Sequence, residues 1–461
     1  MSNPYIPNTG KIREEILGEI GINSINDLFS DIPEEIRFDG ELEIPQLHEM
    51  ELDRHMKFVL SKNSPYTRAI SFLGGGVWPH FVPSHVKSVA GRSEFLTSYT
   101  PYQPETSQGM LQALFEYQSL ISELTGLEVA NASMYDWGAA LGEAALMSAR
   151  ITNRTKFLVP EFISPRRLSV LENYALPANI KIEKIPQDNS TGEIDLPELE
   201  NRVDEDTAGV YVEYPSYLGF IETQMNSISE ISHEEDSIFT VGVNPISLGV
   251  LKPPSSYDAD IVVGEGQPLG NPVNFGGPGL GIFACREERE FVRQIPGRLV
   301  GMTKEKNGDT RGFSMVLQTR EQHIRREKAT SSICTNQALS AVSTAVYLAT
   351  LGESGLRDLA ELCAGNSRHA IKRLNSIEEL NVPLFDSPHF NEFTINFDEA
   401  PISAEEARSK LLTRGIHAGG SIETEFPSLG DTSLWCVTEL HTEEDIDWLI
   451  NSLEDILEGA K

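Results

Sequence analysis

Residues 66–285 alternate helical patterns with short runs of apolar, β-prone residues. The runs are continuously apolar, which is typical of strands that are buried on both faces of a parallel sheet. Helical patterns lie at 105–124, where Gly126 ends the helix, and at 137–147 and 165–174. The alternation predicts a doubly wound α/β domain with helices on both faces of its sheet. The expected strands are Phe157–Val159, Val210–Val212, Ile238–Val243, Ile261–Val263 and Ile282–Ala284.

The length of 461 residues exceeds that of one ordinary domain, so we expect more than one packed unit. Residues 1–65 are acidic and carry isoleucines at helical spacing over Ile12–Ile20, which predicts an N-terminal helical arm. We expect a large α/β domain at 66–330 and a smaller α+β domain at 331–461. The elements expected in the smaller domain are helices at Asn336–Leu351, Gly355–Leu374, Ala404–Arg414 and Thr442–Leu457 and strands at Glu392–Phe397 and Leu434–Val437.

The chain carries 69 acidic and 37 basic residues, a formal net charge of −32. This charge repels nucleic-acid phosphates and anionic membrane surfaces, so neither is expected as a partner. A salt-rich cytoplasm and a need for solubility are both compatible with it. Residues 286–330 are the exception, with 11 basic against 7 acidic side chains. These residues could bind an acidic partner or anionic ligand, or could form ordinary surface ion pairs with neighbouring acids.

The four cysteines lie at least 29 residues apart and form no C-x-x-C pair. Their spacing argues against a metal knuckle or a disulfide framework and predicts a reduced, cytoplasmic location. The chain shows no signal-peptide pattern and no run approaching 18 apolar residues, so export and membrane anchoring are not expected. His80 and His85 lie five residues apart across Pro83, off the i, i+4 spacing of two ligands on one helix, so no metal site is expected.

Two prolines, Pro101 and Pro104, fix a loop that carries hydroxyl and amide side chains. Before this loop, Gly74–Gly76 can adopt positive φ and let a ligand or a backbone approach closely. The loop suits hydrogen bonding to a small polar ligand, but its composition alone favours a rigid contact whose tyrosines pack against a domain or a subunit. The side chains concerned are Tyr99, Thr100, Tyr102 and Gln103.

A second glycine-rich segment spans 264–281 and runs into the strand expected at 282–284. A dinucleotide fingerprint needs glycines that open a helix, so this segment predicts a tight loop between strands instead of a Rossmann cofactor site. The chain also has no P-loop, no G-x-S-x-G elbow and no H-E-x-x-H pair. These short motifs therefore identify no catalytic machinery.

Six longer segments carry distinctive patterns, at Tyr99–Glu105, Gln108–Gln118, Leu124–Asp136, Gly264–Gly270, Arg311–Thr330 and Ser332–Gln337. Together they resemble the glycine cleavage system P-protein family, glycine dehydrogenase (decarboxylating, aminomethyl-transferring). The resemblance covers essentially the whole chain. It implies the fold-type-I transferase fold of pyridoxal-phosphate (PLP) enzymes, with a mostly parallel seven-stranded sheet and a smaller C-terminal α+β domain. Single-chain members have two homologous halves, and this chain is similar to the N-terminal half, which is subunit 1 in split members.

The resemblance makes a chemical test available, because such a PLP enzyme needs a Schiff-base lysine and a carboxylate against the pyridine nitrogen. Anchored on Gly276–Gly279, the lysine position falls nearest Gln267, and an amide cannot form an imine. The carboxylate position falls in Thr240–Asn244, which contains no acid. The nearest lysine, Lys252, lies upstream and is followed by two prolines. We therefore expect no catalytic residue and no covalently bound cofactor on this chain.

The resemblance also implies a partner, subunit 2, which carries PLP in a heterodimer or in an α2β2 assembly. In the family's reaction glycine loses CO₂, and its aminomethyl group passes to the lipoyl cofactor of H-protein. Tyr99, Thr100, Tyr102 and Gln103 would then contribute to the glycine pocket of the partner. Two other functions stay open at this point: an independent PLP-dependent amino-acid enzyme with an unrecognised lysine, and a non-catalytic structural paralogue.

Overall fold

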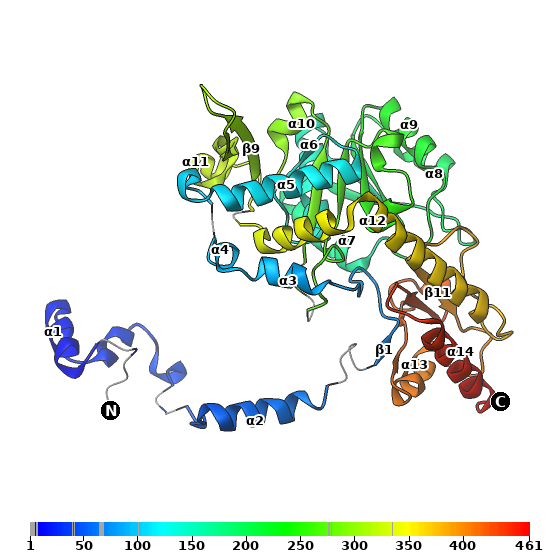
Figure 1. Ribbon diagram of the computed structural model, residues 1–461, viewed down its shortest axis with the longest axis horizontal. Helices are drawn as coiled ribbons and strands as arrows, with labels where there is room; N and C mark the ends of the chain where they lie inside the picture. Colours follow the sequence, from blue (N-terminus) through cyan, green and yellow to red (C-terminus); the bar gives the residue numbers. More distant parts are fainter. Residues whose placement is uncertain are drawn as a thin grey trace. The chain divides into compact units, whose positions relative to one another are not determined.

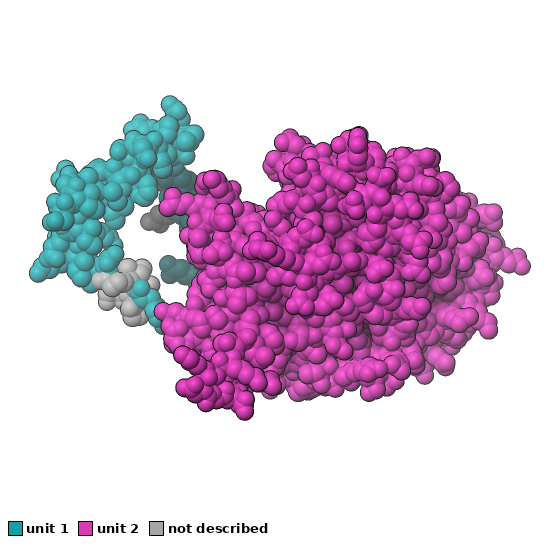
Figure 2. Space-filling view, turned by 90° about the horizontal axis from the view of Figure 1, so that it is seen from above, with its two compact units in different colours: residues 1–64 teal, residues 65–461 magenta. Residues whose placement is uncertain are grey.

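The chain divides into two compact units, residues 1–64 and 65–461, which Figure 2 draws in separate colours. No helix among the described residues is long and apolar enough to cross a membrane. The subdivision at residue 330 stays a prediction. The computed structural model describes residues 5, 8–38, 40, 42–63, 69–99, 101–274, 277, 279–333 and 335–461.

A seven-stranded sheet forms the centre of the second unit (Figure 1), from β2 (Val129–Ala130), β3 (Lys156–Pro160), β4 (Lys181–Ile185), β5 (Thr207–Tyr214), β6 (Ile238–Val243), β7 (Ile261–Glu265) and β8 (Gly281–Cys285). The strand order is β2-β8-β7-β6-β5-β3-β4. The five strands from β7 to β4 in this order run parallel, and β8 lies antiparallel to both of its neighbours. The predicted α/β fold with a mostly parallel seven-stranded sheet is confirmed, and the five strands predicted within residues 66–285 all belong to this sheet.

Helices cover both faces of this sheet, chiefly α5 (Gln108–Thr125), α6 (Trp137–Thr152), α7 (Pro165–Ala175) and α12 (Ala338–Leu374). Successive side chains of a strand point to opposite faces. Val210 of β5 accordingly lies in the hydrophobic core with α5 and α12, whereas its neighbour Tyr211 lies in the core with α6 and α7. The continuous apolar runs in the sequence follow from this double burial.

A smaller antiparallel sheet packs with two helices near the C-terminus, and its elements are β11 (Glu392–Asn396), β13 (Gly420–Ser421), β14 (Thr432–Cys436), α13 (Ala404–Thr413) and α14 (Glu443–Glu458). Its core contains Trp435 and the buried apolar stripe of α14. The first strand of the second unit, β1 (Ile70–Ser71), pairs in parallel with β12 (Ile416–His417). Residues about 350 positions apart in sequence therefore lie side by side in this layer.

Seven of the described strands were not predicted from the sequence, and three of these are the two-residue strands β1, β12 and β13. Two others are the short β2 and the edge strand β4, where three charged residues interrupt two isoleucines. The other two, β9 (Leu299–Lys304) and β10 (Arg311–Val316), form an antiparallel hairpin within the basic stretch. An edge strand or a hairpin exposes one side to water, so its apolar run is interrupted by charge.

The helices predicted at 336–351 and 355–374 form one interrupted helix, α12, with a kink at Gly352, whose φ is 61°. In the first unit the predicted helix at Ile12–Ile20 is present as α1 (Gly10–Ile20), followed by α2 (Glu49–Leu60), and neither buries a side chain. The remaining α-helices are α3 (Ser84–Ala90), α4 (Ser93–Leu96), α8 (Leu196–Arg202), α9 (Met225–Glu234), α10 (Arg289–Gln294) and α11 (Gln322–Arg325).

Candidate functional site

A cavity of about 210 Å³ opens where the carboxyl ends of β3 and β7 meet the N-termini of α6 and α7. The carboxyl ends of parallel strands are where open α/β folds bind ligands. This sheet-edge pocket is therefore the first candidate site. Its lining includes Gly75, Gly76, Asp136, Trp137, Arg167, Glu265 and Gln267.

The N-terminus of α6 points into the sheet-edge pocket but is capped from within the chain. Asp136 is the N-cap residue, and its carboxylate accepts a hydrogen bond from the backbone N–H of Ala139 at 2.7 Å. An uncapped helix N-terminus attracts phosphate through its free N–H groups and its dipole. Here a carboxylate already satisfies one of these donors, and its negative charge opposes a phosphate.

A buried arginine fills part of the same pocket. The Arg167 guanidinium lies 3.6 Å from the centroid of the Trp137 ring and 5.7 Å from that of Tyr217. Its Nη1 lies 2.5 Å from Oε1 of Glu213, and both side chains are almost completely buried. The Tyr211 hydroxyl donates to the same carboxylate oxygen at 3.0 Å. A flat cation thus stacks on the indole ring, where a planar ligand ring would otherwise stack.

Gln267, the residue nearest the expected Schiff-base lysine, forms structural hydrogen bonds with both ends of its side-chain amide. Its Oε1 accepts from the backbone N–H of Trp78 at 3.1 Å, and its Nε2 donates to the carbonyl of Asn271 at 2.7 Å. An ammonium group could not replace the accepting oxygen. None of the described lining residues is a lysine, and Lys252 is exposed and lies outside the lining. The residues present do not fit covalently held PLP.

The segment Thr240–Asn244, where the resemblance places the pyridine-binding acid, forms the end of β6 and is buried. A Cβ atom on Gly242 would lie 2.3 Å from the Tyr211 hydroxyl and 2.7 Å from the Trp137 ring. The glycine therefore makes room for these two rings. An acidic side chain at this position would displace both of them.

Two buried carboxyl groups border the pocket. Gly75 and Gly76 have φ of 83° and 104°, as expected for this glycine run, and the N–H of Gly75 donates to Glu392 at 2.6 Å. Glu265 accepts from the N–H of Leu280 at 2.7 Å. Burial raises the pKa of Glu265 to about 7 and that of Glu392 to about 7. Both groups therefore change protonation near neutral pH.

The loop at residues 99–104, here called the proline-framed loop, borders a second candidate site. The Tyr102 hydroxyl accepts from Arg298 Nη2 at 2.8 Å, and the ring of Tyr102 contacts His323 edge-on with a centroid distance of 5.9 Å. Tyr99 is 78% exposed and Gln103 is also exposed. Thr100 lies outside the described residues. Tyr102 lines a groove with a volume of about 600 Å³ together with Gln318, Glu321, Gln322, His323 and Ile333.

The basic stretch at 286–330 is partly neutralised inside the fold. Arg286 forms an ion pair with Asp260, with Nε and Oδ1 separated by 2.9 Å. Arg320 is mostly buried and donates to the carbonyl of Gly297 at 3.3 Å. Arg325 and Arg326 remain exposed. The surface charge of this stretch is therefore smaller than the sequence count implies.

A family model described as glycine cleavage system P-protein matches residues 3–453. The chain belongs to the glycine cleavage system P-protein family. This membership confirms the resemblance that the sequence motifs carry. The P-protein match extends over the sheet-edge pocket, the proline-framed loop and the C-terminal layer.

Named relatives cover the whole chain. It is 50% identical to the "Probable glycine dehydrogenase (decarboxylating) subunit 1" of Staphylothermus marinus, over 100% of this chain and 99% of that protein. It is 48% identical to the protein of the same name from Thermococcus onnurineus, over 99% of this chain and 100% of that protein. The name "subunit 1" implies that these P-protein relatives act with a second subunit.

Solved structures agree with the family. The crystal structure of glycine decarboxylase (P-protein) of the glycine cleavage system, in inhibitor-bound form, is 40% identical with a TM-score of 0.86, over 99% of this chain and 100% of that chain. A cysteine desulfurase from Thermococcus onnurineus, 17% identical with a TM-score of 0.63 over 87% of this chain and 98% of that chain, shares the fold.

The sequence did not identify the residues that fill the pocket of this P-protein family member. Glu213 gives one local signal, because it is a charge within the apolar run of β5, and a buried charge needs a partner. Nothing in the sequence indicates which basic residue supplies that partner, since Arg167 lies on a different element 46 positions away. Asp136 stands directly before a predicted helix, so its capping role could have been predicted.

Proposed function

We propose that this chain is subunit 1 of a glycine dehydrogenase (decarboxylating) that is active only together with subunit 2, which carries PLP. PLP bound in the partner would serve as the electron sink when glycine loses CO₂. The aminomethyl group would then pass to the lipoyl cofactor of H-protein. We further propose that the complex is a cytoplasmic heterodimer or an α2β2 assembly of two heterodimers.

The observation that carries this proposal is the state of the sheet-edge pocket. Its described lining offers no lysine, Asp136 caps the N-terminus of α6, where a phosphate group would otherwise be attracted, and Arg167 stacks on Trp137. A chain of this family with such a pocket has to obtain its cofactor chemistry from another subunit. The same observation argues against an independent PLP enzyme, and the family membership argues against a purely structural role.

The proline-framed loop is proposed to complete the glycine pocket of the partner. Tyr99 places a phenol in solvent, and Tyr102 is held in place by Arg298 next to an open groove. Tyrosine and glutamine side chains suit hydrogen bonding to a small zwitterion such as glycine. Thr100 and Gln103 belong to the same loop and are included in the proposal.

The exposed arginines Arg325 and Arg326 are proposed to dock subunit 2 or the acidic H-protein. Reversing both charges, with Arg325→Glu and Arg326→Glu, should raise the Michaelis constant for H-protein or weaken complex formation by roughly tenfold. Arg289→Glu, an exposed charge reversal on α10 in the same stretch, is the matched control. Unchanged values of both quantities in the double variant would refute this docking role.

The central test is reconstitution. The chain is purified alone and with subunit 2, and PLP absorbance, its loss on borohydride treatment, and glycine–bicarbonate exchange are measured. We expect the chain alone to be colourless and inactive and the complex to be yellow and active. Exchange activity, or a borohydride-sensitive absorbance, from the chain alone would overturn the proposal.

The loop is tested in the reconstituted complex. Tyr99→Phe, Tyr102→Phe and Gln103→Ala should each lower kcat/KM for glycine by roughly tenfold, or about 1.4 kcal/mol, without changing the PLP absorbance of the complex. Tyr174→Phe, on α7 outside the loop, serves as the control. A loop without contact to the partner's pocket would leave kcat/KM unchanged in all three variants.

A further inference from the structure

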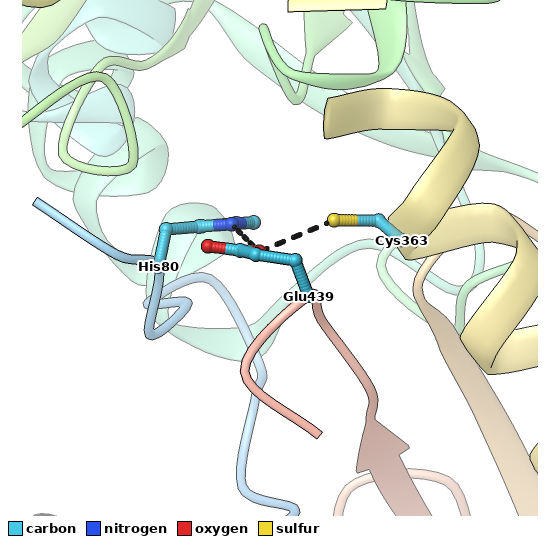
Figure 3. Close-up of side chains that lie close together, drawn as sticks. All are labelled: His80, Cys363 and Glu439. Atoms are coloured by element: carbon cyan, nitrogen blue, oxygen red, sulfur yellow. Dashed lines mark hydrogen bonds and ion pairs between the residues drawn. The ribbon is translucent and has the colours of Figure 1, made fainter. Parts of the chain in front are cut away.

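Three side chains with different donor atoms lie close together (Figure 3). None of the three lines the sheet-edge pocket or the groove beside Tyr102. His80 comes from the loop before α3, Cys363 from α12, and Glu439 from the segment between β14 and α14. One donor atom of each residue lies within 4.8 Å of the other two. The side chain of His80 is 1% exposed and that of Glu439 is 9% exposed, while Cys363 is completely buried.

The hydrogen bonds within this cluster leave one side-chain nitrogen without a partner. His80 Nδ1 lies 2.7 Å from Glu439 Oε2, and the Cys363 thiol donates to the same oxygen at 3.4 Å. His80 Nε2 is buried and has no hydrogen-bond partner among the described residues. A buried polar atom without a partner costs about 1–3 kcal/mol, so the His80 imidazole is only partly satisfied by hydrogen bonds among the described residues.

The donor set has the composition of a transition-metal site. An imidazole nitrogen, a thiolate sulfur and a carboxylate oxygen are the three ligand types that Zn²⁺ takes in proteins. A thiolate and a carboxylate together balance the charge of a dication, which matters in a buried place. No second acid or base is needed to make the loaded site neutral.

The spacing of the donors is also close to what a metal ion requires. Tetrahedral Zn²⁺ with bonds of about 2.0–2.3 Å holds its ligand atoms roughly 3.3–3.6 Å apart. The thiol–carboxylate separation of 3.4 Å already has this value, and the His80–Glu439 hydrogen bond has to lengthen by about half an ångström. The other carboxylate oxygen, Oε1, accepts from the backbone N–H of Phe81 at 2.6 Å, which fixes the orientation of Glu439.

We propose that His80, Cys363 and Glu439 bind one Zn²⁺ ion, with a fourth coordination position left for water. Binding releases the Cys363 thiol proton to solvent, and the proton shared between His80 and Glu439 moves to Nε2 or to solvent. The ion joins three segments that are far apart in sequence. It holds the His80 loop, whose preceding residues Gly75 to Val77 line the sheet-edge pocket, against α12 and the C-terminal layer.

The test uses the full chain without a polyhistidine tag, expressed with zinc and analysed for bound metal. We expect one zinc per chain, and a higher midpoint of thermal unfolding for the loaded than for the chelator-treated chain. Cobalt added to the metal-free chain should give the thiolate-to-cobalt charge-transfer absorbance and the intense visible bands of four-coordinate cobalt. All three readouts concern this chain alone and do not depend on glycine dehydrogenase activity.

Variants separate this site from adventitious binding. Cys363→Ser and His80→Gln should each weaken zinc binding at least about 100-fold, and Cys363→Ser should also abolish the charge-transfer absorbance. His85→Gln, a histidine outside the cluster, and Cys285→Ser, a buried cysteine in β8, should bind like the wild type. If the cluster variants do not fold, the cobalt spectrum of the wild-type chain still shows whether a thiolate binds the metal. Substoichiometric zinc together with no charge-transfer absorbance would overturn the proposal.

Discussion

Arg167 is paired with one carboxylate and stacked on an aromatic ring in a place that is almost closed to water. Arg167→Met keeps an unbranched apolar stem but removes the guanidinium, which leaves Glu213 buried without its cation. Breaking a buried pair in this way costs about 3–5 kcal/mol, because the remaining charge is uncompensated. We expect the free energy of unfolding, measured by urea denaturation, to fall by that amount.

Two further variants make this prediction specific. Arg166→Met changes the exposed neighbour on the same helical turn and should alter stability by less than about 0.5 kcal/mol. Adding Glu213→Gln to Arg167→Met removes the unpaired charge and should recover part of the loss. An Arg167→Met chain as stable as the wild type would show that the buried pair contributes nothing.

Glu265 predicts a dependence of stability on pH. Burial raises its pKa from 4.5 to about 7 in the folded chain, so the folded state binds the proton more tightly than the unfolded state. This contribution to stability is complete below pH 4.5 and is lost as the pH rises towards 7. Glu265→Gln cannot ionise and does not undergo this loss. Between pH 5 and 8 the difference in unfolding free energy should shift in favour of the variant, by on the order of 3 kcal/mol.

Chemical denaturation at a series of pH values measures this shift. Glu454→Gln, an exposed glutamate on α14, is the control, and its curve should run parallel to that of the wild type. A Glu265→Gln curve that is also parallel to the wild type would contradict the raised pKa. Glu392, the second carboxyl with a pKa near 7, can be examined in the same way.

For individual residues, the sequence predicts that the Schiff-base lysine and the pyridine-binding acid are absent, but it does not predict which side chains fill the pocket. The amide at Gln267 and the absence of an acid in Thr240–Asn244 can be read directly once the motifs are aligned. The pairing of Arg167 with Glu213 depends on two elements meeting across the sheet edge, which no local pattern encodes. The His80, Cys363 and Glu439 cluster is hidden for the same reason, because spacing rules detect ligands that share one helix or loop.

Among the secondary-structure elements, α5 holds the β9–β10 hairpin through two glutamine side chains. Gln118 accepts from the N–H of Val300 at 2.9 Å and donates to its carbonyl at 3.0 Å. Gln108 forms the same pair of bonds with Phe313 at 2.9 and 2.8 Å. Each side-chain amide bonds the backbone N–H and carbonyl of one hairpin residue, as a paired strand would. These backbone groups of the hairpin therefore have partners.

Gln118→Leu should therefore loosen the hairpin. The buried N–H and carbonyl of Val300 would lose their partners, at a cost of about 1–3 kcal/mol each. Amide hydrogen exchange over residues 299–316 should accelerate more than in the rest of the sheet. Gln112→Leu, an exposed glutamine on the same helix, is the control. Unchanged exchange in the hairpin of Gln118→Leu would refute the role of this side chain.

The elements divide clearly into those that the sequence predicts and those that it does not. Strands β5, β6 and β7 are buried on both faces, so their apolar runs identify them. In β4, at the sheet edge, charged residues interrupt the isoleucines, and the hairpin relies on Gln108 and Gln118 for its pairing. Their stability comes from tertiary contacts that no local propensity reports.

For the molecule as a whole, the distribution of charge and exposed apolar surface indicates where partners bind. The net charge of −32 keeps the outer surface solvated and repels other acidic proteins. The helices α1 and α2 of the first unit differ from the long helices of the second unit, because neither α1 nor α2 buries a side chain. Ile12, Ile16 and Ile20 follow one face of α1 and are 41%, 43% and 54% exposed. An exposed apolar stripe of this kind marks an interaction site.

We expect this stripe to contact subunit 2 in the complex. Replacing Ile12, Ile16 and Ile20 by serine should change the unfolding free energy of the isolated chain by less than about 1.5 kcal/mol, since none of the three side chains is buried and a surface substitution usually costs no more than about 0.5 kcal/mol. It should weaken association with subunit 2 at least roughly tenfold, measured by sedimentation equilibrium, because the apolar area removed no longer contributes to burial in the complex. Glu15→Ser with Glu19→Ser, on the same helix, is the control. Association unaffected by the isoleucine replacements would show that this stripe does not contact subunit 2.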